Sequence, residues 1–200
     1  MLTIASALDG GAYDRVARAT HWLVAALVVI VVSFGWASEA APRNTPARDS
    51  LLLLHRSLGL VILALVVFRM LWRLWHRAPP LPATAGHLQR ALAHLTQSGL
   101  DAIFLVMPLA GYVNAAAAGH SVSLFGLVVI PPLLPTDERL SQFAIAVHLV
   151  GQYLVYLLVA LHVTGALHHA LIRRDHVLDR MLPPRRRPPA KTPSDDAMAG

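Results

Sequence analysis

Four histidines stand inside long apolar stretches of the sequence: His21, His55, His148 and His162. Burying an ionisable side chain in an apolar segment is costly, so each of these is a candidate functional residue. Imidazole is a common ligand of transition metals, and the chain has 11 histidines but no cysteine. The absence of cysteine excludes disulfides, iron–sulfur clusters, thiolate zinc sites and covalent haem attachment. Histidine is therefore the favoured ligand for any transition metal that this chain binds.

The segments that carry these histidines are suited to lipid rather than water. The chain is 56% hydrophobic and only 14% charged, with a mean hydropathy of +0.54, whereas a soluble domain has about 25% charged residues. A membrane-spanning helix needs about 20 mostly apolar residues. The sequence predicts an all-α, four-helix up-down membrane bundle, with spans at about 15–39, 50–76, 92–119 and 140–173. Arginines near the ends of the second span can extend their charged groups to the interface.

The connections between these spans are rich in residues that break helices. Prolines follow the first span at Pro42 and Pro46 and the second at Pro79–Pro82, and proline cannot continue a helix. The apolar stretch 121–134 is too short for a fifth span, so we expect an interfacial or re-entrant loop. We expect residues 13–182 to form one membrane domain, followed by a disordered cytoplasmic tail at 183–200.

The distribution of basic residues predicts how the bundle is oriented. Its pI of about 10.7 could suggest nucleic-acid binding, but the basic residues gather at the ends of apolar segments, which is a membrane-topology signal. One side of the membrane holds most of them: Arg15, Arg18, Arg69, Arg73, Arg77, Arg90, Arg173, Arg174, Arg180, Arg185, Arg186, Arg187 and Lys191. The other side holds Arg43, Arg48, Arg56 and Arg139. Both termini are therefore predicted to be cytoplasmic in a multi-pass inner-membrane protein. A cleaved signal peptide at the first span is the rival interpretation.

Depth in the membrane sorts the four histidines into two pairs. In this orientation His21 and His162 lie toward the cytoplasmic side, and His55 and His148 lie toward the external side. His148 and His162 are 14 residues apart, which brings them close to one helix face and separates them by about 21 Å. Two six-coordinate haems need this arrangement, because each iron takes one imidazole above its plane and one below.

Other roles for these histidines stay open at this point. A single membrane histidine can simply form a hydrogen bond between helices. Zinc would need further ligands to complete a tetrahedron, and the sequence places no carboxylate or thiolate beside either pair. His94 could replace His21 as a ligand. Asp101 in the third span is expected to pair with Arg69 or Arg73, with proton transfer as the alternative role.

Several short motifs, taken together, resemble the bacterial cytochrome b561 family, which is related to the cytochrome b subunits of nickel–iron hydrogenases. The motifs are Thr20-His21-Trp22, His55-Arg56-Ser57-Leu58-Gly59, Phe125-Gly126-Leu127 followed by prolines, and the pair His148 and His162 followed by His168-His169. The resemblance extends over roughly residues 13–184. It implies four haem ligands at His21, His55, His148 and His162, in agreement with the pairing from depth.

The short four-span form is similar to the superoxide:ubiquinone oxidoreductase type of this family. That resemblance implies a haem-dependent oxidoreductase of the respiratory chain with two haems b, which passes electrons from superoxide outside to ubiquinone. The external loops hold four arginines against four carboxylates, at Glu39, Asp49, Asp137 and Glu138, so net charge alone does not support superoxide capture.

Five further residues are weaker candidates. Arg56 outside, and Arg18 or Arg69 inside, are placed to neutralise haem propionates, although arginines positioned only for topology would look the same. His168 and His169, near the cytoplasmic interface, are candidates for binding quinone or relaying its proton, with interface anchoring as the alternative. No residue is assigned with certainty as catalytic.

Two other classes of protein fit parts of the same pattern. One is a membrane-anchor cytochrome b subunit that relays electrons between a peripheral dehydrogenase or hydrogenase subunit and the quinone pool. The other is a structural membrane protein without haem. Besides lipid, the expected partners are quinone, superoxide and a peripheral redox subunit, and nucleic acid is not among them.

Overall fold

The computed structural model of the chain describes residues 11–76, 78–80 and 85–182. Four long helices account for most of this part. They are α1 (Arg15–Ala40), α2 (Pro46–Trp75), α3 (His87–Ala117) and α4 (Glu138–Leu167). Each is long and apolar enough to cross a membrane. The predicted four-helix membrane bundle is thus confirmed.

Short polar side chains begin three of these helices. The carboxylate of Asp14 accepts the N–H of Ala17 at 2.9 Å, and the Thr45 hydroxyl accepts that of Arg48 at 3.3 Å. Asp137 accepts the N–H groups of Arg139 and Leu140. These caps satisfy N–H groups that have no partner within the helix. Each of these three helices therefore starts at a polar residue that hydrogen-bonds to its first turn.

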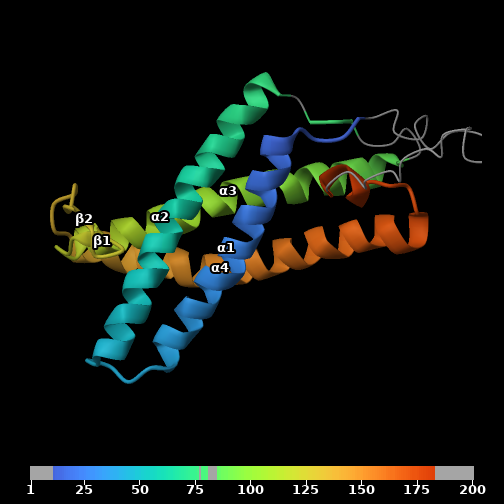
Figure 1. Cartoon of the computed structure of the whole chain (residues 1–200). Coiled ribbons are helices and arrows are strands. Elements are labelled where there is room, and N and C mark those ends of the chain that lie inside the picture. The colour runs from blue at the N-terminus through green and yellow to red at the C-terminus, as the bar shows by residue number, and fades with distance from the viewer. Residues whose placement is uncertain (1–10, 77, 81–84, 183–200) are drawn as a thin grey trace, which may run out of the picture.

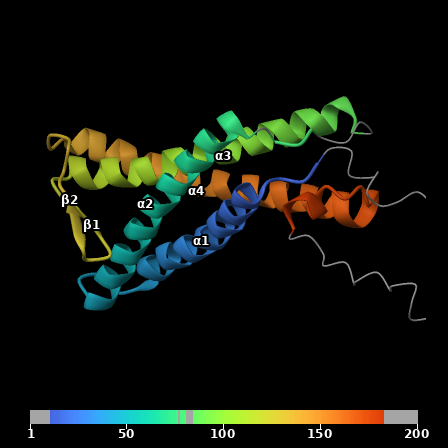
Figure 2. The ribbon, with the colours of Figure 1, turned by 45° about the horizontal axis from the view of Figure 1, so that its top comes forward.

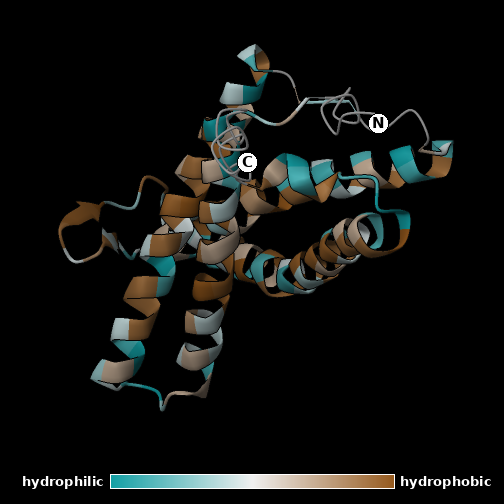
Figure 3. Ribbon diagram, turned by 45° about the vertical axis from the view of Figure 1, so that its right-hand side comes forward, coloured by the Kyte–Doolittle hydropathy of each residue, from teal (hydrophilic) through white to brown (hydrophobic). Residues whose placement is uncertain are grey.

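The helices form two antiparallel hairpins that cross each other. Figure 1 shows α1 beside α2, and α3 beside α4, with the first pair lying steeply across the second. Val24, Ile62 and Val66 are buried where α1 packs against α2. Leu100, Ile103, Val155 and Leu158 are buried between α3 and α4. Many large apolar side chains are exposed, and Figure 3 shows hydrophobic residues along all four long helices. This is the pattern expected of a bundle surrounded by lipid.

Two polar contacts join helices inside these apolar surroundings, one between the two hairpins and one within the α3–α4 hairpin. Trp36 of α1 donates from Nε1 to the hydroxyl of Tyr156 on α4 at 2.8 Å. Asn114 of α3 donates to the backbone and side-chain oxygens of Ser141 on α4. In lipid, a polar group that lacks a partner is costly. Such contacts therefore favour one arrangement of the helices over others.

The connection between α3 and α4 contains a two-stranded antiparallel sheet. Strand β1 (Val122–Leu124) pairs with β2 (Val128–Ile130). This hairpin lies at one end of the bundle beside α2, as Figures 1 and 2 show. The sequence predicted an interfacial or re-entrant loop here, and in the structure these residues form a β-hairpin.

At the other end of the bundle, α4 continues into a π-helix, η2 (His168–Arg173), which stops at Arg174 with a left-handed φ of 52°. A short 3-10 helix, η3 (Leu178–Met181), follows. We call residues 174–182 the C-terminal segment. It folds back over α1, where Trp22 donates to the carbonyl of Met181 at 2.9 Å and Arg18 donates to that of Leu182 at 2.7 Å.

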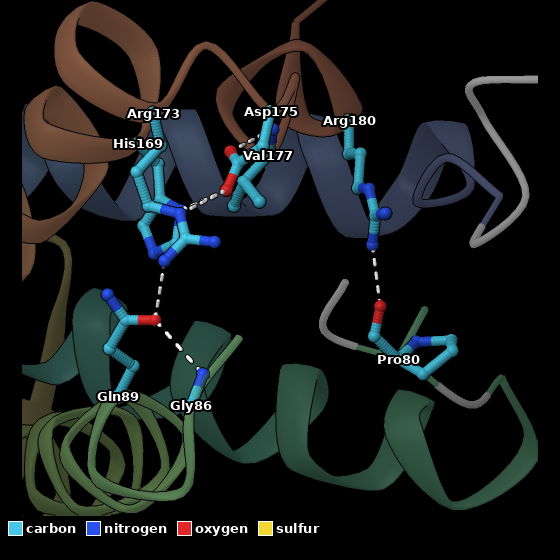
Figure 4. A network of polar contacts seen from close by, with 8 residues as sticks. All are labelled: Pro80, Gly86, Gln89, His169, Arg173, Asp175, Val177 and Arg180. Carbon is cyan, nitrogen blue, oxygen red and sulfur yellow. Dashed lines mark hydrogen bonds and ion pairs between the residues drawn. The ribbon is translucent and has the colours of Figure 1, made fainter. Parts of the chain in front are cut away.

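A polar network fastens the C-terminal segment to the rest of the bundle (Figure 4). Asp175 pairs with His169 at 2.6 Å and with Arg173 at 3.3 Å, and Arg173 donates to Gln89 of α3. Arg180, which is 7% exposed, donates to the carbonyl of Pro80. The segment is thus tied to three different parts of the chain.

The helices extend somewhat beyond the predicted spans. The second begins at Pro46 rather than near residue 50, and the third begins at His87 rather than near 92. In both cases the extra residues are a polar first turn, which a hydropathy pattern does not include. The predicted disordered tail at 183–200 lies outside the described residues.

The network around Asp175 should make the C-terminal segment sensitive to acid. Burial raises the pKa of Asp175, but the hydrogen bond from His169 and the nearby Arg173 outweigh it and hold the pKa below its usual 3.8. A lowered carboxylate pKa stabilises the folded segment above pH 3.8, and this stabilisation is lost as the pH falls through the lower, folded-state pKa. Asp175→Asn should raise hydrogen exchange of residues 174–182 at neutral pH roughly fivefold, the factor for about 1 kcal/mol.

Exchange rates, corrected for the intrinsic effect of pH, would be measured by mass spectrometry on the detergent-solubilised protein. Asp179→Asn is the matched control, because the ion pair of Asp179 within the described residues is with the exposed His176. Equal protection in wild type and Asp175→Asn would contradict the assigned role of the carboxylate.

Candidate metal centres

One helix supplies a histidine to each of two ring pairs. His148 and His162 both lie on α4, and 14 residues of α-helix separate them by about 21 Å with nearly the same facing direction. Their partners come from the other helix hairpin, His55 from α2 and His21 from α1. The pairing predicted from depth is therefore the pairing found in the structure.

We name the two pairs after the sides of the membrane that the sequence predicts for them, external for His55 and His148 and cytoplasmic for His21 and His162. In the external pair the ring centroids lie 5.9 Å apart at an interplanar angle of 75°. The Nδ1 atom of His55 is 2.9 Å from the carbonyl oxygen of Val31, and that of His148 is 2.9 Å from the carbonyl oxygen of Met107. Since a carbonyl only accepts, both Nδ1 atoms carry the proton. In its neutral form each ring then keeps a free lone pair on Nε2, as a metal-binding histidine requires.

The cytoplasmic pair has the same spacing. The ring centroids of His21 and His162 also lie 5.9 Å apart, at an interplanar angle of 59°. The ring of His21 meets the edge of Trp22 at a centroid distance of 5.3 Å. For this pair the described residues provide no carbonyl partner like those of the external pair. Its ring orientation is therefore less strictly held by hydrogen bonds than that of His55 and His148.

The spacing of both pairs fits an iron between the rings. Imidazole nitrogens bind metals at about 2.0 Å, so rings on opposite sides of one metal have centroids about 6 Å apart. A direct hydrogen bond within the neutral external pair is excluded, because both Nε2 atoms are acceptors. Among residues 11–76, 78–80 and 85–182 no three His, Asp or Glu side chains gather at a common metal position. Two imidazoles with no third protein ligand suit haem, whose porphyrin supplies the remaining four ligands.

A cavity of about 240 Å³ surrounds the external pair. Its lining comes from all four long helices and includes His55, His148 and Arg56. Three glycines also line it, Gly35, Gly59 and Gly111. A Cβ at Gly35 would lie 3.1 Å from Cε1 of His55, and one at Gly111 would lie 3.5 Å from Nδ1 of His148. Glycine at position 35 therefore lets α1 approach the His55 ring closely.

Arg69 is the most distinctive basic residue near the cytoplasmic pair. Its Nη1 atom is buried and has no hydrogen-bond partner in the described part of the chain. A buried unpaired guanidinium nitrogen is costly, so it marks a position where an anionic group belongs. Arg18, the other predicted candidate, instead donates to the backbone carbonyl of Leu182.

The remaining predicted residues fall in three places. Arg73 forms an ion pair with Asp101, which confirms the salt bridge expected for that carboxylate. His168 is exposed, whereas His169 is half-buried and bound to Asp175. His94 lies exposed on α3, and it is His21 whose ring is paired with His162.

Sequence patterns did not reveal the glycines that line the cavity or the carbonyl groups that bond to His55 and His148. They also did not reveal that the Nη1 atom of Arg69 is buried without a partner in the described chain. The glycines had a detectable signal, since an isolated glycine inside a helical pattern often marks a close approach. The carbonyls of Val31 and Met107 had none, because every residue carries a carbonyl and only tertiary packing decides which one meets a histidine.

Four apolar helices around paired imidazoles define a membrane cytochrome of the b type. The sequence model of the prokaryotic cytochrome b561 family matches residues 12–184, which is most of the chain. The chain therefore belongs to the prokaryotic cytochrome b561 family and is a bacterial membrane electron carrier that binds haem b.

Individual relatives agree with this assignment over nearly their whole length. A "probable superoxide oxidase CybB" of Yersinia pestis is 30% identical over 166 residues, which cover 83% of this chain and 93% of the relative. Two proteins of Escherichia coli strain K12 are also similar. "Cytochrome b561 homolog 2" is 29% identical over 182 residues (85% of this chain, 90% of the relative), and "cytochrome b561 homolog 1" is 26% identical over 170 residues (83% and 94%).

The close contact between Gly35 and His55 can be tested by adding a methyl group. Gly35→Ala should push the His55 ring from its position, because the new Cβ would lie 3.1 to 3.2 Å from two ring atoms. We expect the haem content of the purified protein to fall by about half, measured as the pyridine haemochrome.

Two other glycines provide matched controls. Gly111→Ala should be tolerated, because its Cβ would make ordinary contact with His148, and Gly165→Ala meets nothing within 4 Å. Full haem content in Gly35→Ala would show that His55 does not depend on this close approach.

Proposed function

We propose that the chain binds two haems b, one at each histidine pair, and carries electrons across the inner membrane to ubiquinone. The observation that supports this most directly is the repeated 5.9 Å ring spacing at two levels of α4. When bound, the haems supply reversible one-electron chemistry, and a pair of imidazoles leaves no open iron position for oxygen. The protein's own contribution is to hold ligands, charges and protons in place.

We further propose that both termini are cytoplasmic, so that His55 and His148 lie toward the outside. The excess of Arg and Lys at the end of the bundle that holds His21 and His162 supports this orientation. The domain that performs the transfer then corresponds to residues 13–182. The histidine levels, about 21 Å apart along α4, would cover much of the hydrophobic thickness of the membrane.

Arginines would hold the anionic groups of the two haems. At the external site we assign a propionate to Arg56, which lines the cavity and is exposed. At the cytoplasmic site we prefer Arg69 to Arg18, because Arg69 has a buried atom without a partner and Arg18 already binds the C-terminal segment. A propionate bound here would accept a charge-assisted hydrogen bond from Arg69.

Superoxide is the proposed electron donor, as the printed name of the Yersinia relative suggests. The external charges are evenly balanced in number but not in arrangement. Arg48 lies 3.6 Å from Glu39, and Asp137 is engaged in capping α4, whereas Arg56 forms no ion pair with any described residue and lies at the cavity. A propionate bound to Arg56 would neutralise this charge, so the proposed donor rests on the name of the relative and not on electrostatic capture.

Ubiquinone is the proposed acceptor, and we place its proton supply at His168 and His169. His169 is the better oriented of the two, because its Nδ1 atom is bound to Oδ2 of Asp175 at 2.6 Å. With Nδ1 held in this way, Nε2 is the atom that can bind a quinone oxygen and deliver a proton to it. Asp175 would stabilise the protonated ring between successive transfers.

Loss of one ligand at a time tests the two-haem proposal. His148→Ala should remove the external haem and leave the cytoplasmic one, and His162→Ala should do the reverse. Haem per chain would fall from two to one in each case, measured by pyridine haemochrome and by reduced-minus-oxidised spectra. His94→Ala, an exposed histidine outside both pairs, should keep both haems. Loss of both haems, or of neither, in His148→Ala would contradict the pairing.

The proposed reaction and the role of His169 can be tested together on the purified protein. Enzymatically generated superoxide should reduce added ubiquinone without any partner protein, whereas a membrane-anchor subunit would need one. His169→Gln should slow quinone reduction about 100-fold, the usual loss of a proton donor, with unchanged haem spectra. His176→Asn is the control, because His176 pairs only with the exposed Asp179. Unchanged quinone reduction in a His168→Gln, His169→Gln double variant would refute the site.

A further inference from the structure

The hairpin between α3 and α4 has one face against the bundle and an apolar tip that nothing in the described structure covers. Val122 is 3% exposed and lines the external cavity. By contrast, Leu127 is 85% exposed, Val129 63% and Leu133 72%. Residues 121–134 contain no charged side chain. An exposed apolar patch of this kind marks an interaction surface.

Two hydroxyl groups hold the hairpin in this orientation. Ser57 of α2 is fully buried, and its Oγ atom accepts the N–H of Phe125 at 2.8 Å while donating to the carbonyl of Leu53. Tyr112 of α3 donates to the carbonyl of Pro131 at 2.9 Å and accepts the N–H of Leu133 at 3.1 Å. The exposed tip is therefore fixed relative to the helices rather than free to fold back.

The turn at the tip is also unusually constrained. Phe125 and Gly126 have φ values of 52° and 75°, and the N–H of Leu127 bonds to the carbonyl of Leu124 at 2.9 Å. A positive φ is strained for phenylalanine, so the surrounding contacts must hold it there, and the bond to Ser57 is one of them. This conformation leaves Leu127 exposed at the tip.

The depth of the attachment point places the hairpin near the membrane surface. Ser57 lies 11 residues beyond Pro46, the first residue of α2, which is at most about 16 Å along the membrane normal. The charged residues Arg48 and Asp49 mark the first turn of that helix. Figure 2 shows the hairpin beside this part of α2 rather than beyond its end. The hairpin thus lies inward of the charged first turn, where headgroups give way to acyl chains.

Backbone chemistry limits how deep the hairpin can go. Two paired strands leave their outer edges without ladder partners, and an unpaired N–H or C=O is costly in the hydrocarbon core. At the interface these groups can still meet water or lipid headgroups. We infer that the hairpin is a membrane-interface anchor, with Leu127, Val129 and Leu133 resting among the phospholipids of the external leaflet. The long helices beside the hairpin likewise expose many large apolar side chains, as expected of surfaces in contact with lipid.

Single-cysteine labelling can test this inference, because the natural chain has no cysteine. Leu127→Cys and Val129→Cys would each carry a nitroxide in the full-length, haem-loaded protein, reconstituted in phosphatidylcholine and phosphatidylglycerol vesicles. Arg43→Cys is the matched control, an exposed position on the α1–α2 connection at the same end of the bundle. Power saturation compares contact with oxygen, which concentrates in lipid, and with a water-soluble nickel chelate.

We expect labels at Leu127 and Val129 to contact oxygen several-fold more than nickel, with the opposite preference at Arg43. Nickel contact at Leu127 equal to that at Arg43 would place the tip in water and overturn the proposal. Spin–spin broadening at Leu127 that disappears on dilution with unlabelled protein would place a second copy on this surface, which also overturns it. None of these outcomes depends on which residues bind haem.

Discussion

The geometry of both candidate metal centres depends on the distance between two imidazole rings, which must match the distance across a metal bound between them. Rings that collapsed together would exclude a metal, and rings farther apart would not reach it. The gap recurs at two levels because α4 carries one ring of each pair at a rigid helical spacing, while α1 and α2 carry the other two. The relative placement of the two helix hairpins therefore sets the geometry of both centres at once.

The bundle meets this requirement with few buried residues, because lipid rather than water surrounds it. Association of helices in lipid draws little on the hydrophobic effect and relies on close packing and polar contacts. Glycines at 35, 111 and 151 allow such approaches beside His55, His148 and Met107. The hydrogen bond between Trp36 and Tyr156 joins α1 to α4. These two helices carry His21 and His162, so the bond helps to fix the distance between the two rings.

The two centres differ in what holds and surrounds them. The external rings are oriented by backbone carbonyls, border a cavity and lie beneath a hairpin fastened by Ser57. The rings of His21 and His162 lack these carbonyl bonds within the described chain and instead lie near Arg69, whose Nη1 atom is buried without a partner. The two centres therefore differ both in how their rings are oriented and in the charge beside them.

The four spans, the identity of the paired histidines and the partner of Asp101 could all be predicted from the sequence. Hydropathy determines which segments enter lipid, and helical rise converts residue number into depth, so residues at matching depth can be paired without coordinates. Only the tertiary structure decided that Val31 and Met107 orient the external rings, that Gly35 touches His55, and that Arg69 rather than Arg18 has a buried unpaired atom. These facts depend on the rotation and crossing of helices, which arise from packing between distant segments and leave no periodic trace in any one of them.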